Sequence, residues 1–170
     1  MILLKRSLAL VALGFGVLAG CNYTFQAGAG LPSDARTVAF QTFENETDRL
    51  EVSQELYDAF LEEFPSTFGV QVASEENADV LVRGSIRQYS LDAPSYRSDD
   101  RGGAEVVERR VNISIAIQII DVRNQIILWE NTSLSERGEY LEASQLEEDG
   151  RELAISRLVR ATIDGLQSNW

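Results

Sequence analysis

The side chains with which this 170-residue chain could do chemistry are few. It has no histidine and one cysteine, Cys21, and its only lysine is Lys5 near the N-terminus. Ser-His and Cys-His nucleophiles and histidine-containing zinc sites are therefore excluded, and beyond Lys5 no lysine can form a Schiff base. Carboxylates, tyrosine, serine and arginine remain. We predict that the protein is not an enzyme and that it holds no metal and no cofactor.

Adjacent carboxylates are the main candidates for acid–base or metal chemistry. Such work needs carboxylates that converge on one cleft. Neighbours in a strand point to opposite faces, and neighbours in a helix diverge by about 100°. We therefore interpret four pairs as solvated charge at helix ends and in loops: Glu62-Glu63, Glu75-Glu76, Asp99-Asp100 and Glu147-Glu148.

Cys21 ends an N-terminal segment with the layout of a secretory signal. Lys5-Arg6 comes first, an apolar run from Leu8 to Leu18 follows, and small residues precede the cysteine. The run is shorter than the roughly 20 residues that span a bilayer. The ending Leu-Ala-Gly-Cys looks like a bacterial lipobox, which is cleaved between Gly20 and Cys21 and whose cysteine carries S-diacylglycerol and an N-acyl group. The alternatives are an ordinary signal peptide and an N-terminal membrane anchor.

Composition sets the domain count and the class of partner. We predict a signal peptide over residues 1–20, a lipidated tether over 21–36 and a single domain over 37–170. The formal net charge is −12, and loss of Lys5 and Arg6 makes it −14. This sign argues against nucleic-acid binding, and it leaves the acyl chains as the expected contact with the membrane. Asn22 follows the cysteine in place of an aspartate, which by resemblance to enterobacterial sorting favours the outer membrane.

The hydrophobic pattern predicts the elements that carry these groups. A β-rich segment covers residues 37–43, and apolar residues spaced by four predict a helix that ends at Phe64, before Pro65. Strict alternation predicts strands over 80–87 and 111–119, with an antiparallel partner over 126–134. We expect a mobile loop from Asp92 to Ala104 and a final helix from about Glu142.

These elements predict the fold class α+β: a mixed, mostly antiparallel sheet of four to five strands with two helices packed on one face. We expect the apolar face of the long hairpin to pack on both helices. Its opposite face is polar, and with the segment from Asp92 to Ala104 it remains available for a partner.

Four arginines are candidates for an anionic-ligand patch. Arg83 and Arg87 share one strand face, and Arg109 and Arg110 lie on another strand beside the expected loop. Guanidinium groups suit phosphate and carboxylate ligands. The alternative is that each arginine pairs with a nearby glutamate on an exposed face.

The chain resembles the LptE family of lipopolysaccharide (LPS)-assembly lipoproteins along the whole segment after the signal. The features that carry the resemblance are Cys21 to Phe25, Leu31-Pro32, Phe43 to Thr47 before a helix, Ala78 to Gly84 before a strand, a long strand that ends in Asp121, Leu128-Trp129 in its partner, and a terminal amphipathic helix.

This resemblance implies an outer-membrane lipoprotein that assembles with and plugs the LptD-type β-barrel and assists LPS transport to the cell surface. The net charge argues against direct LPS binding unless the arginines cluster. A second interpretation is a lipoprotein cofactor of a peptidoglycan synthase or a secretion channel, because the opening strand with Val38-Ala39, Phe43 and Asn45 also fits that class. A periplasmic hydrolase lacks the side chains it would need.

Overall fold

The computed structural model describes residues 30–98 and 104–168. The predicted signal peptide, the cleavage site at Gly20 and the lipid attachment at Cys21 lie outside these residues, as do Asp99 and Asp100.

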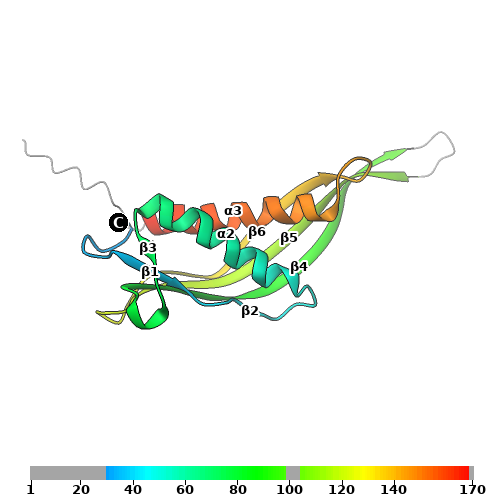
Figure 1. Ribbon diagram of the computed structural model, residues 1–170. Coiled ribbons are helices and arrows are strands. Elements are labelled where there is room, and N and C mark those ends of the chain that lie inside the picture. Colours follow the sequence, from blue (N-terminus) through cyan, green and yellow to red (C-terminus); the bar gives the residue numbers. More distant parts are fainter. Residues whose placement is uncertain (1–29, 99–103, 169–170) are drawn as a thin grey trace, which may run out of the picture.

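The described chain folds into one sheet and two long helices (Figure 1). The sheet order is β3-β1-β4-β5-β6, and β2 also pairs with β4. β1 is parallel to β3 and β4, whereas β4, β5 and β6 are antiparallel, so the predicted mixed, mostly antiparallel α+β fold is confirmed. The elements are β1 (Thr37–Phe40), β2 (Glu44–Asn45), α2 (Glu51–Phe68), β3 (Gln71–Val72), a 3-10 turn (Glu75–Asn77), β4 (Val80–Ser98), β5 (Ala104–Asp121), β6 (Ile126–Leu141) and α3 (Glu147–Ser168).

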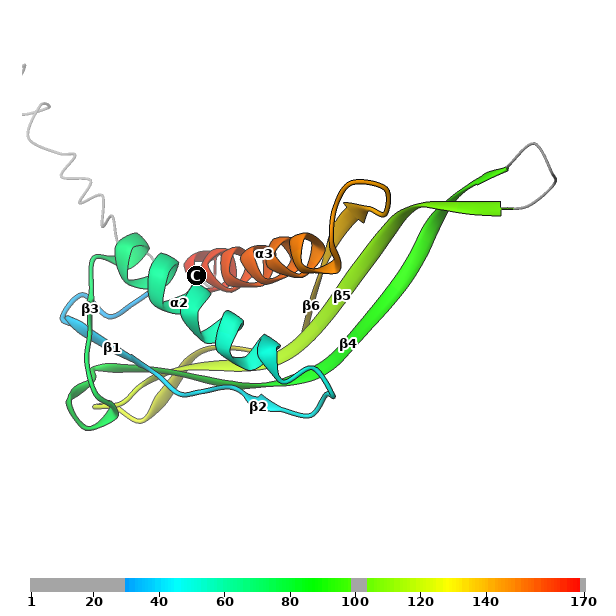
Figure 2. The same cartoon turned by 45° about the vertical axis from the view of Figure 1, so that its right-hand side comes forward.

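Both helices cover the same face of the sheet (Figures 1 and 2). The five β-branched residues of β5 from Val111 to Ile119 point to this face and are at most 1% exposed. They meet the apolar sides of the helices, which include Val52 and Phe60 of α2 and Leu158 and Val159 of α3. The long hairpin therefore packs on both helices through its apolar face, as its alternation predicts.

α2 continues one turn beyond the predicted end at Phe64, because Pro65 lies inside the last turn of the helix rather than after it. Gly69, in the left-handed conformation at φ 68°, ends α2 instead. The extra turn brings Phe68 against Phe64, with ring centroids 4.6 Å apart. The apolar stripe of α2 also stacks Phe60 on Phe43 at 5.4 Å.

The expected mobile loop from Asp92 to Ala104 is wrong for the described residues, because β4 runs on to Ser98 and β5 already begins at Ala104. β4 has 19 residues and β5 has 18, so each spans about 60 Å. α2 and α3 have 18 and 22 residues and are only about 27 and 33 Å long. The hairpin must therefore project beyond the helices (Figure 2). We call residues 92–98 and 104–108 the arm.

The opposite end of the domain holds the start of the described chain. Gly30 lies beside Leu166 of α3 and Phe68 of α2. The carboxylate of Asp79 accepts the backbone N–H of Arg36 at 2.7 Å and that of Thr37 at 3.1 Å. The Arg36 bond is the largest cause that lowers the pKa of Asp79, so the carboxylate stays charged. The tether end and the arm thus lie at opposite ends of the domain (Figure 1).

The final helix begins at Glu147, five residues later than predicted, and packs closely on β6. A Cβ at Gly138 of β6 would lie 1.9 Å from the carbonyl oxygen of Gly150 in α3. A Cβ at Gly165 would lie 2.4 Å from the ring of Trp129. Trp129 is therefore packed against the helix rather than displayed on the surface.

We expect Gly138→Ala to lower the free energy of unfolding by about 1–3 kcal/mol, because the added methyl group meets backbone atoms that a rotamer change cannot move. Ser135→Ala, at an exposed position of the same strand, should change it by less than about 0.5 kcal/mol. Urea unfolding of the two variants measures the difference. Equal stability would show that β6 and α3 are not held this closely.

Candidate functional site

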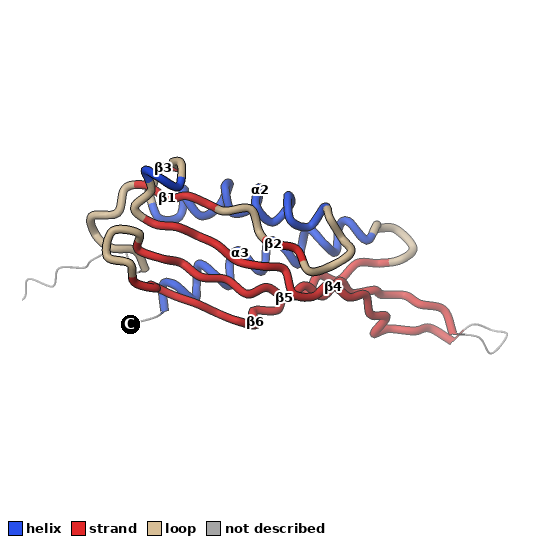
Figure 3. Tube along the Cα trace, turned by 90° about the horizontal axis from the view of Figure 1, so that it is seen from below, coloured by secondary structure: helices blue, strands red, loops and turns tan. Residues whose placement is uncertain are grey.

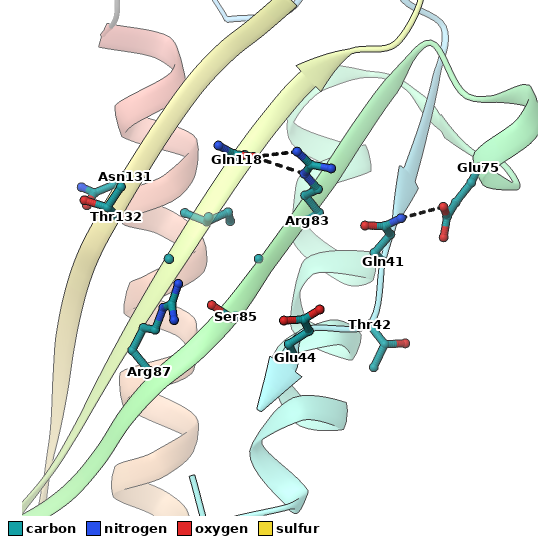
Figure 4. Close-up of a pocket in the computed structure, with 13 residues that line it drawn as sticks. Gln41, Thr42, Glu44, Glu75, Arg83, Ser85, Arg87, Gln118, Asn131 and Thr132 are labelled. Carbon is teal, nitrogen blue, oxygen red and sulfur yellow. Dashed lines mark hydrogen bonds between the residues drawn. The ribbon is translucent and has the colours of Figure 1, made fainter. Parts of the chain in front are cut away.

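Figure 3 shows the face of the sheet that the helices leave uncovered. This face carries a polar groove (Figure 4). Its cavity volume is about 710 Å³. Small residues such as Ser85 and Ala116 form its floor, and longer polar side chains form its walls. The lining residues come from β4, β5, β6 and the segment between β1 and β2, and they include Gln41, Thr42, Glu44, Arg83, Arg87, Gln118, Asn131 and Thr132.

Arg83 extends across the sheet from β4 towards β5 (Figure 4). Its Nε and Nη2 donate to Oε1 of Gln118 at 3.2 and 3.0 Å, and Nε2 of Gln118 donates to Glu130 of β6 at 3.0 Å. Arg83 forms no ion pair with any residue between 30 and 98 or between 104 and 168. It therefore presents a cationic group to the groove whose charge no carboxylate directly neutralises.

Arg87 lines the same groove but has a carboxylate partner. It is the extra residue of a β-bulge, since Ile86 pairs with Ile115 and Gln88 with Ser114. Its Nη1 pairs with Glu46, which follows β2. Arg87 thus links β4 to the β2 segment, and Arg83 and Arg87 are the two predicted patch residues that the structure brings together.

Arg109 and Arg110 lie elsewhere, at the base of the arm. Arg110 is eight positions along β5 from Gln118, the residue opposite Arg83, and this separation is roughly 26 Å at 3.3 Å per residue. Arg109 pairs with Glu142 at 2.7 Å and Arg110 with Glu139 at 3.4 Å. The four arginines therefore lie in two places, and three of them have glutamate partners.

Glu139 is shared between the sheet and α3. Arg157 of α3 donates to Glu139 at 2.8 Å and also to the backbone carbonyl of Arg137 at the free edge of β6. The hydrogen bond from Arg157 is the largest cause that lowers the pKa of Glu139. At neutral pH these contacts cover the edge of β6 next to the arm.

The base of the arm also contains a polar cluster that sequence reasoning missed. Tyr89 of β4 donates to Glu147 of α3 at 2.6 Å, and the same oxygen of Glu147 accepts Arg49 at 2.7 Å. Arg151 of α3 donates two bonds to Glu55 of α2, at 2.7 and 2.9 Å. Desolvation is the largest cause that raises the pKa of Tyr89, and the Glu55 bonds raise the pKa of Arg151. The cluster fastens both helices to the sheet where the arm begins.

The groups that line the groove are suited to binding. Within residues 30–98 and 104–168, no group of three or more Asp, Glu, His or Cys side chains could hold a metal ion. The described helices include none that is long and apolar enough to cross a membrane. The groove offers amide, hydroxyl and guanidinium groups, which recognise polar and anionic surfaces.

A comparison with protein-family models identifies the family of this chain. The LptE lipopolysaccharide-assembly family matches residues 35–168. The chain belongs to this LptE family. The match covers the sheet and both helices, and the family is one of lipoproteins, which agrees with the resemblance in the sequence. No curated protein matches this sequence closely.

Solved structures show the same fold at low identity. A hypothetical protein from Chlamydia trachomatis has a TM-score of 0.53 at 12% identity, over 78% of this chain and 96% of that one. A PelC dodecamer from Paraburkholderia phytofirmans has a TM-score of 0.51 at 13% identity, over 84% and 94%. A DUF330 protein from Xanthomonas campestris has a TM-score of 0.51 at 8% identity, over 81% and 85%. The LptE-like architecture is therefore found in proteins with little sequence in common.

The contact between Arg151 and Glu55 gives a matched test of the cluster. The Arg151 side chain is only 10% exposed, and Glu55→Gln removes the closer of its two carboxylate partners. We expect a loss of about 1–3 kcal/mol in the free energy of unfolding. Glu51→Gln removes two longer contacts of a more exposed carboxylate, at 3.7 Å to Arg151 and 3.6 Å to Arg49, and should cost less than about 1 kcal/mol. Urea unfolding that ranks the two variants equally would contradict this account.

Proposed function

We propose that this protein is an outer-membrane lipoprotein that assembles with an LptD-type β-barrel and assists LPS transport to the cell surface. The observation that carries the proposal is the LptE family match over residues 35–168. The open polar face and the arm support it, because they are two surfaces that the domain itself does not cover.

The membrane anchor in this proposal is Cys21. Cleavage after Gly20 leaves Cys21 as an acylated N-terminus, residues 21–36 lead from it into the domain, and Asn22 favours the outer membrane. Two or three acyl chains, at about 0.8 kcal/mol per buried methylene, hold such a domain stably at the membrane. The net charge of −12 gives no other general attraction to anionic lipid.

The barrel contact is assigned to the polar face of the sheet and to the arm. The lumen of an outer-membrane barrel is polar, so a plug needs a polar surface of matching shape rather than an apolar one. The outer face of β4 and β5 meets this need with Ser85, Gln88, Ser114 and Gln118. An isolated two-stranded ribbon is only marginally stable in water, which favours a partner for the arm.

Direct contact with LPS is assigned only to Arg83 and Arg87. They line one groove, and Arg83 has no described carboxylate partner. Arg109 and Arg110 are paired with glutamates at the base of the arm and are too distant to join them. The acidic balance of the chain opposes long-range attraction of an anionic glycolipid, so this contact serves close-range positioning.

The first test is a detergent pull-down of the full-length lipoprotein from outer membranes of its own organism, with mass spectrometry of the bound proteins. We expect a stoichiometric LptD-type barrel. In a second sample, residues 97–105 are replaced by Asn-Gly, which closes the hairpin directly beyond the Tyr96–Val106 pair. The barrel should be lost from this sample while the melting temperature is retained.

The control for the shortened arm places the same Asn-Gly dipeptide at Asn124-Gln125, in the β5–β6 turn at the other end of the domain. This variant should still recover the barrel protein. Unchanged recovery with the shortened arm would contradict the arm contact. Recovery of a peptidoglycan synthase or a secretion subunit in place of a barrel would transfer the function to the second interpretation.

The anchor has a separate test. Cys21→Ala should abolish incorporation of labelled palmitate and release the protein from the membrane fraction, because the acylated sulfur is lost. Asn22→Gln keeps the cysteine and should keep both properties. Palmitate incorporation into the Cys21→Ala variant would show that the lipid is attached elsewhere.

A further inference from the structure

The outer face of the sheet is not polar along its whole length. Leu81 of β4, Ile120 of β5 and Ile127 of β6 stand side by side at the tether end, because they are paired in register. The next such row consists of Arg83, Gln118 and Glu130. Val122 of the β5–β6 turn and Ile126, the first residue of β6, are exposed as Ile127 is, whereas Leu81 and Ile120 are only partly exposed. We call the set the apolar tip: Leu81, Ile120, Val122, Ile126 and Ile127.

The apolar tip is presented by a fixed turn. The Asp121 carboxylate accepts the backbone N–H of Asn124 at 2.9 Å and its side-chain amide at 2.8 Å, and Gln125 takes the left-handed conformation at φ 55°. Val122 is 36% exposed, Ile126 53% and Ile127 50%. Exposed apolar residues that are held this way indicate a binding surface rather than a poorly packed core.

The cation at the turn is paired with carboxylates. Arg123 lies between Val122 and Ile126, and its guanidinium pairs with Asp34 at 3.0 Å and Asp79 at 3.3 Å. Asp34 belongs to the segment through which the chain enters the domain. The ion pairs therefore direct the cation towards the tether segment and leave apolar side chains at the extremity.

The length of the tether limits how far this end of the domain can lie from the membrane. Gly30 packs against Leu166 and Phe68 at the same end of the domain. From Cys21, nine residues can span at most roughly 30 Å. With Cys21 acylated, as proposed above, Gly30 is held within that reach of the bilayer, and the apolar tip lies at the same end of the domain. The arm, about 40 Å farther along β5, is held away from it.

We propose that the apolar tip inserts into the interfacial region of the bilayer that holds the acyl chains. The inference rests on the proposed lipid anchor at Cys21. It gives the domain a second membrane contact, and the two contacts together set the orientation of the long axis, with the arm directed away from the lipid. Because Arg123 is paired, the contact depends on apolar side chains and does not require anionic lipid.

The test uses the full-length acylated lipoprotein in vesicles of phosphatidylethanolamine and phosphatidylglycerol. Acylation of Cys21 leaves no other thiol, so Ile127→Cys can carry a polarity-sensitive fluorophore. The matched control is Leu146→Cys, at a residue that is 69% exposed just before α3 at the arm end. Val122→Cys is a second probe of the tip.

We expect blue-shifted emission and quenching by brominated lipid at positions 127 and 122, and neither effect at position 146. Both effects should persist in about 0.5 M salt and in vesicles without anionic lipid. Melting temperatures equal to that of the parent protein confirm that the labelled proteins are folded.

Aqueous emission at positions 122 and 127, or equal quenching at position 146, would overturn the proposal. A blue shift that follows protein density without lipid quenching would assign the tip to a second copy and would also overturn it. The barrel pull-down is independent of these outcomes. Recovery of the barrel with an aqueous tip would leave the proposed function intact and reject only this inference.

Discussion

The structure depends on one constraint. Only one face of the long β4–β5 hairpin carries the apolar side chains that the two helices bury. The row from Val111 to Ile119 is sealed by α2 and α3. The alternate residues, including Asn112, Ser114 and Gln118, remain outside because they cannot be buried without partners. One-sided burial therefore produces both the stable core and the uncovered polar face (Figure 3).

Unequal lengths of helix and strand follow from the same constraint. A residue adds about 3.3 Å to a strand but 1.5 Å to a helix, so helices of similar residue number cover only half of the hairpin. The arm is the far end of the part that the helices do not cover. At its base, the cluster of Tyr89, Glu147, Arg151 and Glu55 closes the end of the core with hydrogen bonds where apolar coverage stops.

The sequence was informative wherever a face is buried. The alternation in β5 and the spacing by four in α2 identify their elements, because burial selects residues at the structural period. The arm is not evident in the sequence, because its residues follow no such period. Pro94, Gly102 and the charged residues around them look like a loop. Backbone pairing of β4 with β5 continues through the arm, and such pairing leaves little trace in side-chain identity.

The distances between residues on different elements were equally hard to predict. The predicted patch groups Arg83 with Arg110, whereas the register places Arg110 eight positions from Gln118, the residue opposite Arg83. The Arg151–Glu55 contact joins residues 96 apart, and no local pattern predicts it. Turn position and helix packing decide such distances, and neither is encoded in the spacing of the residues themselves.

The division of charge along the domain indicates how a strongly acidic protein can serve an anionic transport route. Most described arginines are committed to carboxylates, so the molecule does not gather positive charge into one attractive surface. Arg83 is an exception, held by an amide within a polar groove. The features that distinguish this domain are therefore the shape of its surfaces and their positions on the fold. The arm, the open face and the tether end each point in a fixed direction from one core.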